Sequence, residues 1–70
     1  MIFFVIELQD NGISGAALPY AFTDELQAEA QYHTLLAAAA MSQVPVHTVT
    51  LIRGDGFVIK SESYDHRTAE

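Results

Sequence analysis

The sequence predicts an α+β domain with element order ββαββ, in which a four-stranded antiparallel sheet carries one long helix packed on one face. Three observations predict this fold. Four short segments are rich in β-branched and aromatic residues, two glycine-containing turn signals separate neighbouring segments, and an alanine- and leucine-rich segment lies between the two pairs. A chain of 70 residues has room for one domain, so we assign residues 1–70 to one.

The first strand is predicted over Ile2–Gln9. Because side chains alternate along a strand, one face takes the even-numbered residues, which are Ile2, Phe4, Ile6 and Leu8. The other face takes Phe3, Val5, Glu7 and Gln9. The even-numbered face is wholly apolar, so we expect it to meet the helix.

The second strand is predicted over Gly15–Phe22, after the turn Asp10-Asn11-Gly12. Asn-Gly favours a type I′ hairpin turn, because both of its central residues take positive φ. Proline cannot donate to a strand ladder, so Pro19 places this strand at a sheet edge or at a bulge.

The helix is predicted from about Asp24 to Ser42, with Thr23 or Asp24 as its N-cap. One apolar stripe at spacings of four and three should face the sheet: Leu26, Ala30, His33, Ala37 and Met41. In the second half of the helix this stripe is widened by Leu35, Leu36, Ala39 and Ala40. The second half of the helix is apolar on nearly all sides, which predicts that more than one side is covered. The small side chains of residues 37–40 allow a neighbour to approach closely.

Pro45 ends the helical segment, and the third strand is predicted over Val46–Arg53. Asp55-Gly56 is the expected centre of a second hairpin turn. The fourth strand follows over Phe57–Tyr64. Residues 65–70 are polar, and we expect a frayed tail there.

Composition favours self-association. Half of the residues are hydrophobic, seven are aromatic, and there is no cysteine to form a disulfide or a thiolate metal site. A domain of this size buries only about 60% of the surface that its unfolded chain exposes, so one copy has little room for so many apolar side chains. We therefore expect a homo-oligomer, with the sheet face opposite the helix as the natural contact surface.

The charge of the chain and its short apolar start argue against two classes of partner, nucleic acids and membranes. The net charge is −6, and Lys and Arg together number only three, so we expect no direct nucleic-acid binding. The acidic balance fits solubility, or mimicry of a nucleic acid towards a basic partner. The apolar start of the chain is too short to span a bilayer and lacks the basic residues of a secretory signal, which favours an intracellular protein with no membrane contact.

The sequence contains no motif for catalysis. No nucleophile elbow, dinucleotide-binding glycine pattern or phosphate-binding loop is present, so we predict that the protein is not an enzyme and needs no cofactor. Glu29 and His33 lie one helical turn apart and could share a metal, but the sequence offers no clear third ligand. A hydrogen bond between these two side chains is the simpler interpretation, and we predict no metal site.

Six residues form a candidate ligand-binding set: Tyr32, His33, His47, Arg53, Lys60 and Tyr64. Aromatic rings can stack on a base, and Arg or Lys can pair with a phosphate, so the set suits a nucleotide-like ligand. A monomer this small offers little concavity, and the pocket would have to form between subunits. The alternative is that the six are scattered surface residues. His66, in the run Tyr64-Asp65-His66-Arg67, is expected either in a solvated tail or as part of an anion grip.

The stretch of residues 31–51, QYHTLLAAAAMSQVPVHTVTL, resembles short uncharacterised proteins encoded by phages and prophages of Gram-positive gut bacteria. The matching features are Tyr32-His33, the small-residue helix end, Val44-x-Val46-His47, the Asp55-Gly56 turn and Lys60-x-Glu62-x-Tyr64. The resemblance covers most of the chain from the helix onward and brings no catalytic residues with it.

The resemblance implies a phage origin and a cytoplasmic location in a host bacterium. The leading hypothesis is a non-enzymatic, homo-oligomeric binding protein that antagonises bacterial anti-phage defence by sequestering a nucleotide immune signal between subunits. Two alternatives stay open. One is a virion or tail-assembly accessory protein, and the other is a direct inhibitor of a host defence protein. The leading hypothesis and both alternatives rest on analogy and not on site chemistry.

Overall fold

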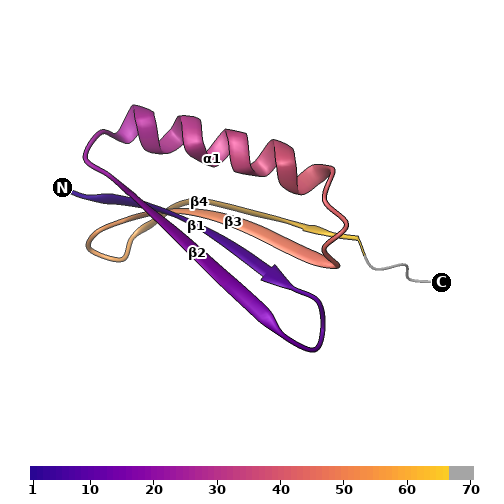
Figure 1. Ribbon diagram of the computed structural model, residues 1–70. Coiled ribbons are helices and arrows are strands. Elements are labelled where there is room, and N and C mark those ends of the chain that lie inside the picture. Colours follow the sequence, from indigo (N-terminus) through magenta and orange to yellow (C-terminus); the bar gives the residue numbers. More distant parts are fainter. Residues whose placement is uncertain (67–70) are drawn as a thin grey trace.

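The computed structural model describes residues 1–66, and its elements follow the predicted ββαββ order (Figure 1). The five elements are β1 (Phe3–Asp10), β2 (Gly15–Phe22), α1 (Glu25–Ala40), β3 (Val46–Arg53) and β4 (Val58–Asp65). All strand pairs are antiparallel, and α1 lies across one face of the sheet. The predicted fold class is confirmed.

The strand order in the sheet is β2-β1-β3-β4. Because β2 and β3 are each antiparallel to β1, they run parallel to one another with β1 between them. The chain therefore passes from β2 through α1 to β3 as a β–α–β crossover above β1. Pro19 lies in the edge strand β2, as its missing N–H predicted.

The bounds of β2 and β3 match the prediction, while β1 and β4 each begin and end one residue later than expected. Helix α1 begins after Asp24, whose carboxylate accepts a hydrogen bond from the Leu26 N–H at 3.0 Å. This N-cap satisfies one of the free donors of the first turn. At the other end, the Met41 N–H donates to the Ala38 carbonyl.

The first hairpin does not contain the predicted type I′ turn. In the second hairpin the Gly56 N–H donates to the Arg53 carbonyl, so the turn is centred on Gly54 and Asp55, one residue earlier than the predicted Asp55-Gly56. Gly12 and Gly56 have φ of 90° and 94°, but no residue other than glycine has a positive φ in the described chain. The first connection is instead a four-residue loop, residues 11–14, in which the Asn11 side-chain carbonyl accepts from the N–H groups of Ile13 and Ser14. The Asn side chain replaces the turn hydrogen bonds that a left-handed Asn backbone would have set up.

The hydrophobic core lies between α1 and the sheet. Its fully buried members are few and mostly small: Val5, Ala28, Tyr32, Ala39, Val49 and Leu51. Partly buried side chains surround them, including Phe3, Leu35, Leu36 and Ile59. The largest side chains that are wholly inaccessible are a leucine and two valines, so the core is thin for a chain of this length.

The face of β1 that meets the helix is the opposite of the predicted one. Val5 and Glu7 are buried against α1, whereas Leu8 is 41% exposed on the other face. The handedness of a β–α–β crossover fixes which sheet face its helix covers. That choice is made by the connection from β2 to β3, so the hydrophobic pattern of β1 alone could not reveal it.

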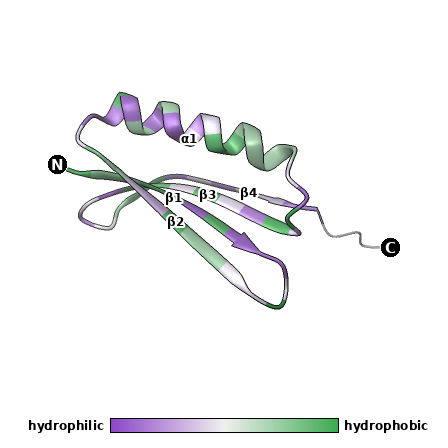
Figure 2. Cartoon of the chain, viewed as in Figure 1, coloured by the Kyte–Doolittle hydropathy of each residue, from purple (hydrophilic) through white to green (hydrophobic). Residues whose placement is uncertain are grey.

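The stripe of α1 that meets the sheet is only partly the predicted one. Ala39, Leu35 and Leu36, which widen the predicted stripe, do pack against the core, but its predicted centre line does not. The buried helical residues are Ala28, Tyr32 and Ala39, while Leu26 is 75% exposed and Met41 is 87% exposed. A shift of two residues along a helix is a rotation of about 200°, so the centre line of the predicted stripe points away from the sheet. Apolar residues surround the second half of α1 (Figure 2), and their period therefore could not select one face.

The chain end is held as far as the structure describes it. Asp65 is the last residue of β4, and the His66 N–H donates to the Pro45 carbonyl at 2.7 Å. The His66 Nε2 also lies 2.9 Å from the Ala39 carbonyl at the end of α1. Asp65 and His66 thus belong to the fold and not to a frayed tail. The rest of the predicted tail, residues 67–70, lies outside the described residues.

Candidate functional site

The sheet face opposite α1, which we call the open sheet face, is the largest candidate interaction surface of the described chain. Strand register places these side chains on it: Phe4, Ile6, Leu8, Ala17, Pro19, Ala21, Thr48, Thr50, Ile52, Val58, Ser61 and Ser63. No element within residues 1–66 covers this face (Figure 1). Its centre is the even-numbered side of β1, flanked by small apolar residues of β2.

The open sheet face exposes apolar side chains and almost no charge. Leu8 and Val58 are 41% and 49% exposed, and Phe4 and Ile6 are half-buried by their neighbours within the sheet. The carboxylates on this side belong to Asp10 and Asp65, which sit together at one end of the sheet. Four strands of eight residues make a face of roughly 26 by 19 Å, or about 500 Å². The apolar part of this face is smaller, because Thr48, Thr50, Ser61 and Ser63 present hydroxyl groups on β3 and β4. Apolar patches of a few hundred Å² on a monomer are often functional.

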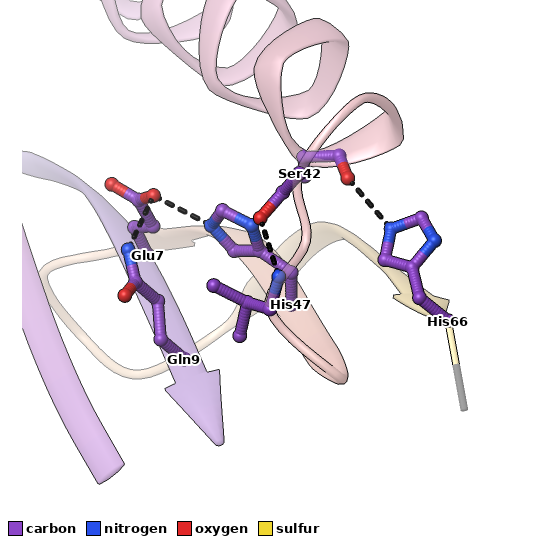
Figure 3. Close-up of polar contacts among 7 residues, drawn as sticks. Glu7, Gln9, Ser42, His47 and His66 are labelled. Atoms are coloured by element: carbon purple, nitrogen blue, oxygen red, sulfur yellow. Dashed lines mark hydrogen bonds and ion pairs between the residues drawn. The ribbon is translucent and has the colours of Figure 1, made fainter. Parts of the chain in front are cut away.

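A buried ion-pairing contact lies on the helix-facing side. The His47 Nε2 is 2.6 Å from the Glu7 carboxylate, and the Gln9 amide donates to the same oxygen at 3.2 Å (Figure 3). Register explains the contact, because β1 and β3 pair Glu7 with Val49 and Gln9 with His47. An ionised carboxylate can only accept, so the His47 ring donates from Nε2.

The other ring nitrogen of His47, Nδ1, is buried without a hydrogen-bond partner. The His47 residue is 4% exposed and Glu7 is 9% exposed. A general base must reach the proton that it removes, and neither side chain is accessible to a substrate in this arrangement. The pair is therefore part of the core and imposes a cost on it, because a buried polar atom without a partner destabilises the fold.

The structure gathers some of the six predicted ligand-binding residues but not all. Tyr64 lies opposite His47 in the β3–β4 register, and the buried Tyr32 ring contacts the exposed His33 ring edge-on at 5.4 Å. Arg53, however, is six residues from His47 on β3, which is about 20 Å along a strand. A single pocket in one chain cannot include both ends of the set.

The two cations of the set are already paired. Arg53 forms a two-bond contact with the Asp55 carboxylate, at 2.8 and 3.2 Å, and its guanidinium lies 4.6 Å from the centre of the Phe57 ring. The Lys60 ammonium lies 2.6 Å from the Glu29 carboxylate. A phosphate would have to compete with these carboxylates.

The pKa values of the groups around these cations shift accordingly. The hydrogen bond to Lys60 lowers the pKa of Glu29, and the same bond raises the pKa of Lys60. The hydrogen bond from Arg53 lowers the pKa of Asp55, with help from the Phe57 N–H. Burial raises the pKa of Tyr32, and the nearby Glu62 charge adds to that effect.

His66 has a structural role that no sequence pattern predicted. Its ring lies parallel to that of Tyr64, with 6.1 Å between the ring centres. The His66 Nε2 lies near the Ala39 carbonyl at the end of α1, and Figure 3 draws this contact of His66 with the helix. The Ala39 carbonyl already accepts from the Ser42 N–H at 3.2 Å, so His66 adds a second contact to the C-terminal end of α1. A local sequence pattern could not predict this contact, because β3 and β4 separate α1 from His66 along the chain.

One small hollow opens beside the first hairpin. It has a volume of about 160 Å³ and is lined by Gln9, Asn11, Ser14, Gly15, Ala16 and Val44. Small-molecule sites usually measure about 300 Å³ or more, so this hollow is too small for a nucleotide. Among residues 1–66, no three His, Asp or Glu side chains gather as a metal site requires. In the same part of the chain, no helix is both long and apolar enough to cross a bilayer.

Comparison of the chain with protein-family models, with curated proteins and with solved structures finds no match.

Proposed function

We propose that this protein is a non-enzymatic, homo-oligomeric binding protein whose copies associate through the open sheet face. The observation that carries the proposal is the uncovered apolar side of β1, above all Phe4, Ile6 and Leu8. The face lies on a domain in which residues 1–66 include only six fully buried hydrophobic residues, two of them alanines. Such a domain gains more from a partner than a larger one would.

Association through the open sheet face removes apolar surface from water. Fully burying one large aliphatic or aromatic side chain contributes about 1.5–3 kcal/mol. The residues of the open sheet face are already partly covered by their neighbours, so each retains a fraction of that gain. Several such residues together still match the total stability of a small domain, which is about 5 kcal/mol.

The distribution of charge over the chain favours a second copy as the partner. Two chains of net charge −6 repel one another wherever carboxylates face carboxylates. Away from the end that contains Asp10 and Asp65, the open sheet face presents no charge, so copies can meet there with little repulsion. Two sheets stacked in this way pack about 10 Å apart with their strands nearly aligned.

The proposal includes a biological role, which rests on the resemblance to phage and prophage proteins. In that role the oligomer antagonises bacterial anti-phage defence and holds a nucleotide immune signal. The six predicted residues Tyr32, His33, His47, Arg53, Lys60 and Tyr64 all lie on α1 or on the helix side of the sheet, away from the open sheet face, and Tyr32 and His47 are buried. The ligand contacts that remain within reach are those of His33, Arg53, Lys60 and Tyr64. The hollow beside the first hairpin is lined by none of the six predicted residues. Binding a phosphate through Lys60 would require this side chain to leave Glu29.

Sedimentation across a dilution series tests the association. Leu8→Lys places a cation on the open sheet face, and because it reduces the net charge it does not add general repulsion. We expect the wild-type chain to form an oligomer that dissociates on dilution, and the Leu8→Lys chain to form a smaller species at the same concentration. The matched control is Ile13→Lys, since Ile13 is 96% exposed in the first hairpin loop and should leave the assembly unchanged.

Circular dichroism of each variant establishes that it is folded. An identical mass for Leu8→Lys and wild type would overturn the proposed contact surface, and so would a folded wild-type chain that stays monomeric at high concentration.

Calorimetric titration with cyclic and ADP-ribose-type nucleotides tests the ligand. We expect heat of binding with at least one of them, lost in Lys60→Gln. Absence of heat and of any thermal shift with the whole panel would remove nucleotide sequestration. Co-purification with virions would then favour a virion or tail-assembly accessory protein, and a stable complex with a host protein would favour a direct inhibitor.

A further inference from the structure

We propose that the outer edge of β4 pairs with the same edge of a second copy, antiparallel and centred on Ser61, to make one continuous eight-stranded sheet. This inference shares with the proposed function the premise that the chain binds its own copies. It concerns a different surface, however, and the two can fail separately.

The two edges of the sheet differ in their capacity to pair. The sheet ends in β2 on one side and β4 on the other. Pro19 removes a donor from β2 and Gly15 weakens its start, so this edge is poorly suited to another strand. Strand β4 contains neither proline nor glycine, and beyond the irregularity near Leu51 it runs in regular register to Asp65.

Backbone hydrogen bonding shows which residues of β4 point outward. The His66 N–H donates to the Pro45 carbonyl, which extends the β3–β4 register by one pair. Hydrogen-bonded pairs alternate along an antiparallel ladder. The residues that turn their N–H and C=O groups towards β3 are therefore Lys60, Glu62 and Tyr64. Between them, Ser61 and Ser63 turn theirs away from the sheet, towards the position of an added strand.

This alternation restricts how two copies of β4 can pair. A hydrogen-bonded ladder must place Ser61 of one copy opposite an outward-facing residue of the other. Centring the pair on Ser61 places Lys60 of each copy opposite Glu62 of the other, and the two-fold symmetry makes this contact twice. A shift towards Ser63 would place Glu62 opposite Glu62, and a shift towards Ile59 would place Lys60 opposite Lys60.

Charge therefore favours the register centred on Ser61 over the two registers next to it. In the register centred on Ser61, Lys60 and Glu62 occupy non-hydrogen-bonded pairs, where opposite Cα atoms are about 4.5 Å apart and side chains are close. Opposite charges there stabilise the pairing and like charges destabilise it. Lys60 also contacts Glu29, which holds its ammonium group on the helix side of β4, the same side as Glu62.

On the open sheet face, the β4 side chains next to the proposed edge contact are small enough for two copies to approach closely. Ser61 and Ser63 are short, and the Ser61 hydroxyl lies 3.0 Å from the Thr50 hydroxyl within its own sheet.

Charged residues on an edge strand can also serve to prevent pairing. If Lys60 and Glu62 served to prevent pairing, β4 edges would not associate, and reversing one of these charges would leave the assembly unchanged. If they pair across the two β4 edges, reversing one charge should weaken the assembly.

A charge-reversal cycle tests the register. We expect Lys60→Glu alone, and Glu62→Lys alone, each to raise the dissociation constant of the edge contact about tenfold or more, because each places like charges opposite one another twice. The double variant Lys60→Glu/Glu62→Lys restores opposite charges across the seam and should return the constant to within about threefold of wild type. Sedimentation equilibrium measures the four chains.

The control is Glu29→Gln, which removes the contact between Lys60 and α1 but leaves the β4 edge intact. We expect it to keep the wild-type constant. The cycle is repeated in the Leu8→Lys background, in which contact through the open sheet face is disrupted. A dimer that persists in Leu8→Lys and dissociates when Lys60→Glu is added supports the edge contact.

Amide hydrogen exchange supplies a second measurement that does not depend on charge. The N–H groups of Ser61 and Ser63 should exchange more slowly as protein concentration rises, because pairing removes them from water. The inference is overturned if neither single reversal changes the mass, if the double variant dissociates as readily as the singles, or if exchange at both serines is independent of concentration. None of these outcomes bears on the Leu8→Lys result, so the proposed function would still stand.

Discussion

The Glu7 carboxylate and the His47 ring are two polar groups buried in a thin core. They contact one another through Nε2 of the ring, and Nδ1 has no hydrogen-bond partner. Removing one member of a buried pair strands the other, which typically costs about 3–5 kcal/mol. Replacing both members by apolar residues of similar volume removes the desolvation cost altogether. The pair is thus expected to be strongly coupled without being a net source of stability.

A double-substitution cycle measures this coupling. We expect His47→Leu to lower the free energy of unfolding by about 3 kcal/mol, because Glu7 keeps only the Gln9 amide as a partner. Glu7→Leu should also destabilise the fold. The combined Glu7→Leu/His47→Leu chain should be as stable as wild type or more stable by about 1 kcal/mol or more, as measured by urea unfolding. Simple addition of the two single losses in the double variant would contradict this account.

The contact between Glu29 and Lys60 predicts how stability depends on pH. A carboxyl whose pKa is lower in the folded chain contributes stability above its ordinary pKa, and this stability is lost as the pH falls through the lowered value. Glu29→Gln should therefore flatten the acid side of the stability profile. Glu25→Gln makes the same change of charge one turn earlier on α1 and leaves the hydrogen bond to Lys60 intact. An acid profile that is the same for wild type and Glu29→Gln would contradict the prediction.

The packing of α1 on the sheet depends on its smallest side chains. Ala28 and Ala39 are completely buried, one near each end of the helix, and Tyr32 fills the wider space between them. This arrangement lets the helix axis lie close to β3, the strand that contributes most of the buried aliphatic core. The small residues at the end of the helix do allow a close approach, although the side that approaches the sheet is only partly the predicted one.

Enlarging one of these alanines tests the close contact. We expect Ala39→Leu to destabilise the fold by about 1–3 kcal/mol, because extra methylene groups in a packed core force neighbouring atoms to move. Ala38→Leu is the matched control, since Ala38 is exposed on the same turn and leucine is also a good helix former. Chemical unfolding of the two variants should separate them. Equal stabilities would show that Ala39 has room to spare.

For the molecule as a whole, stability and assembly should be linked. A ligand or partner that binds only the folded chain raises its apparent stability, and a second copy does so in a concentration-dependent way. The thin core and the uncovered sheet face make this coupling the expected source of much of the stability.

Thermal unfolding at several protein concentrations checks the link. The midpoint should rise by several degrees as the concentration increases a hundredfold, because about 1 kcal/mol shifts the midpoint of a small domain by about 4–8 °C. The Leu8→Lys chain should show a smaller rise. A midpoint that is identical at all concentrations would mean that the monomer is sufficient, contrary to the proposed association.

Local features of the chain were enough to locate every element. Proline, glycine and aspartate mark the ends of the strands and of α1, and β-branched residues identify β3 to the residue. Pro19 correctly placed β2 at an edge, because a missing N–H is a property of one residue wherever it lies. These signals act over a few positions, and the physical forces behind them act over the same range.

Which surfaces face inward was decided only by the tertiary structure. The even-numbered side of β1 and the side of α1 that contains Leu26 are both apolar, yet both face outward. The contacts of His47 with Glu7 and of His66 with Ala39 join residues 40 and 27 positions apart. The handedness of the crossover from β2 to β3 and the register of the whole sheet set all of these, and neither is a property of any single segment.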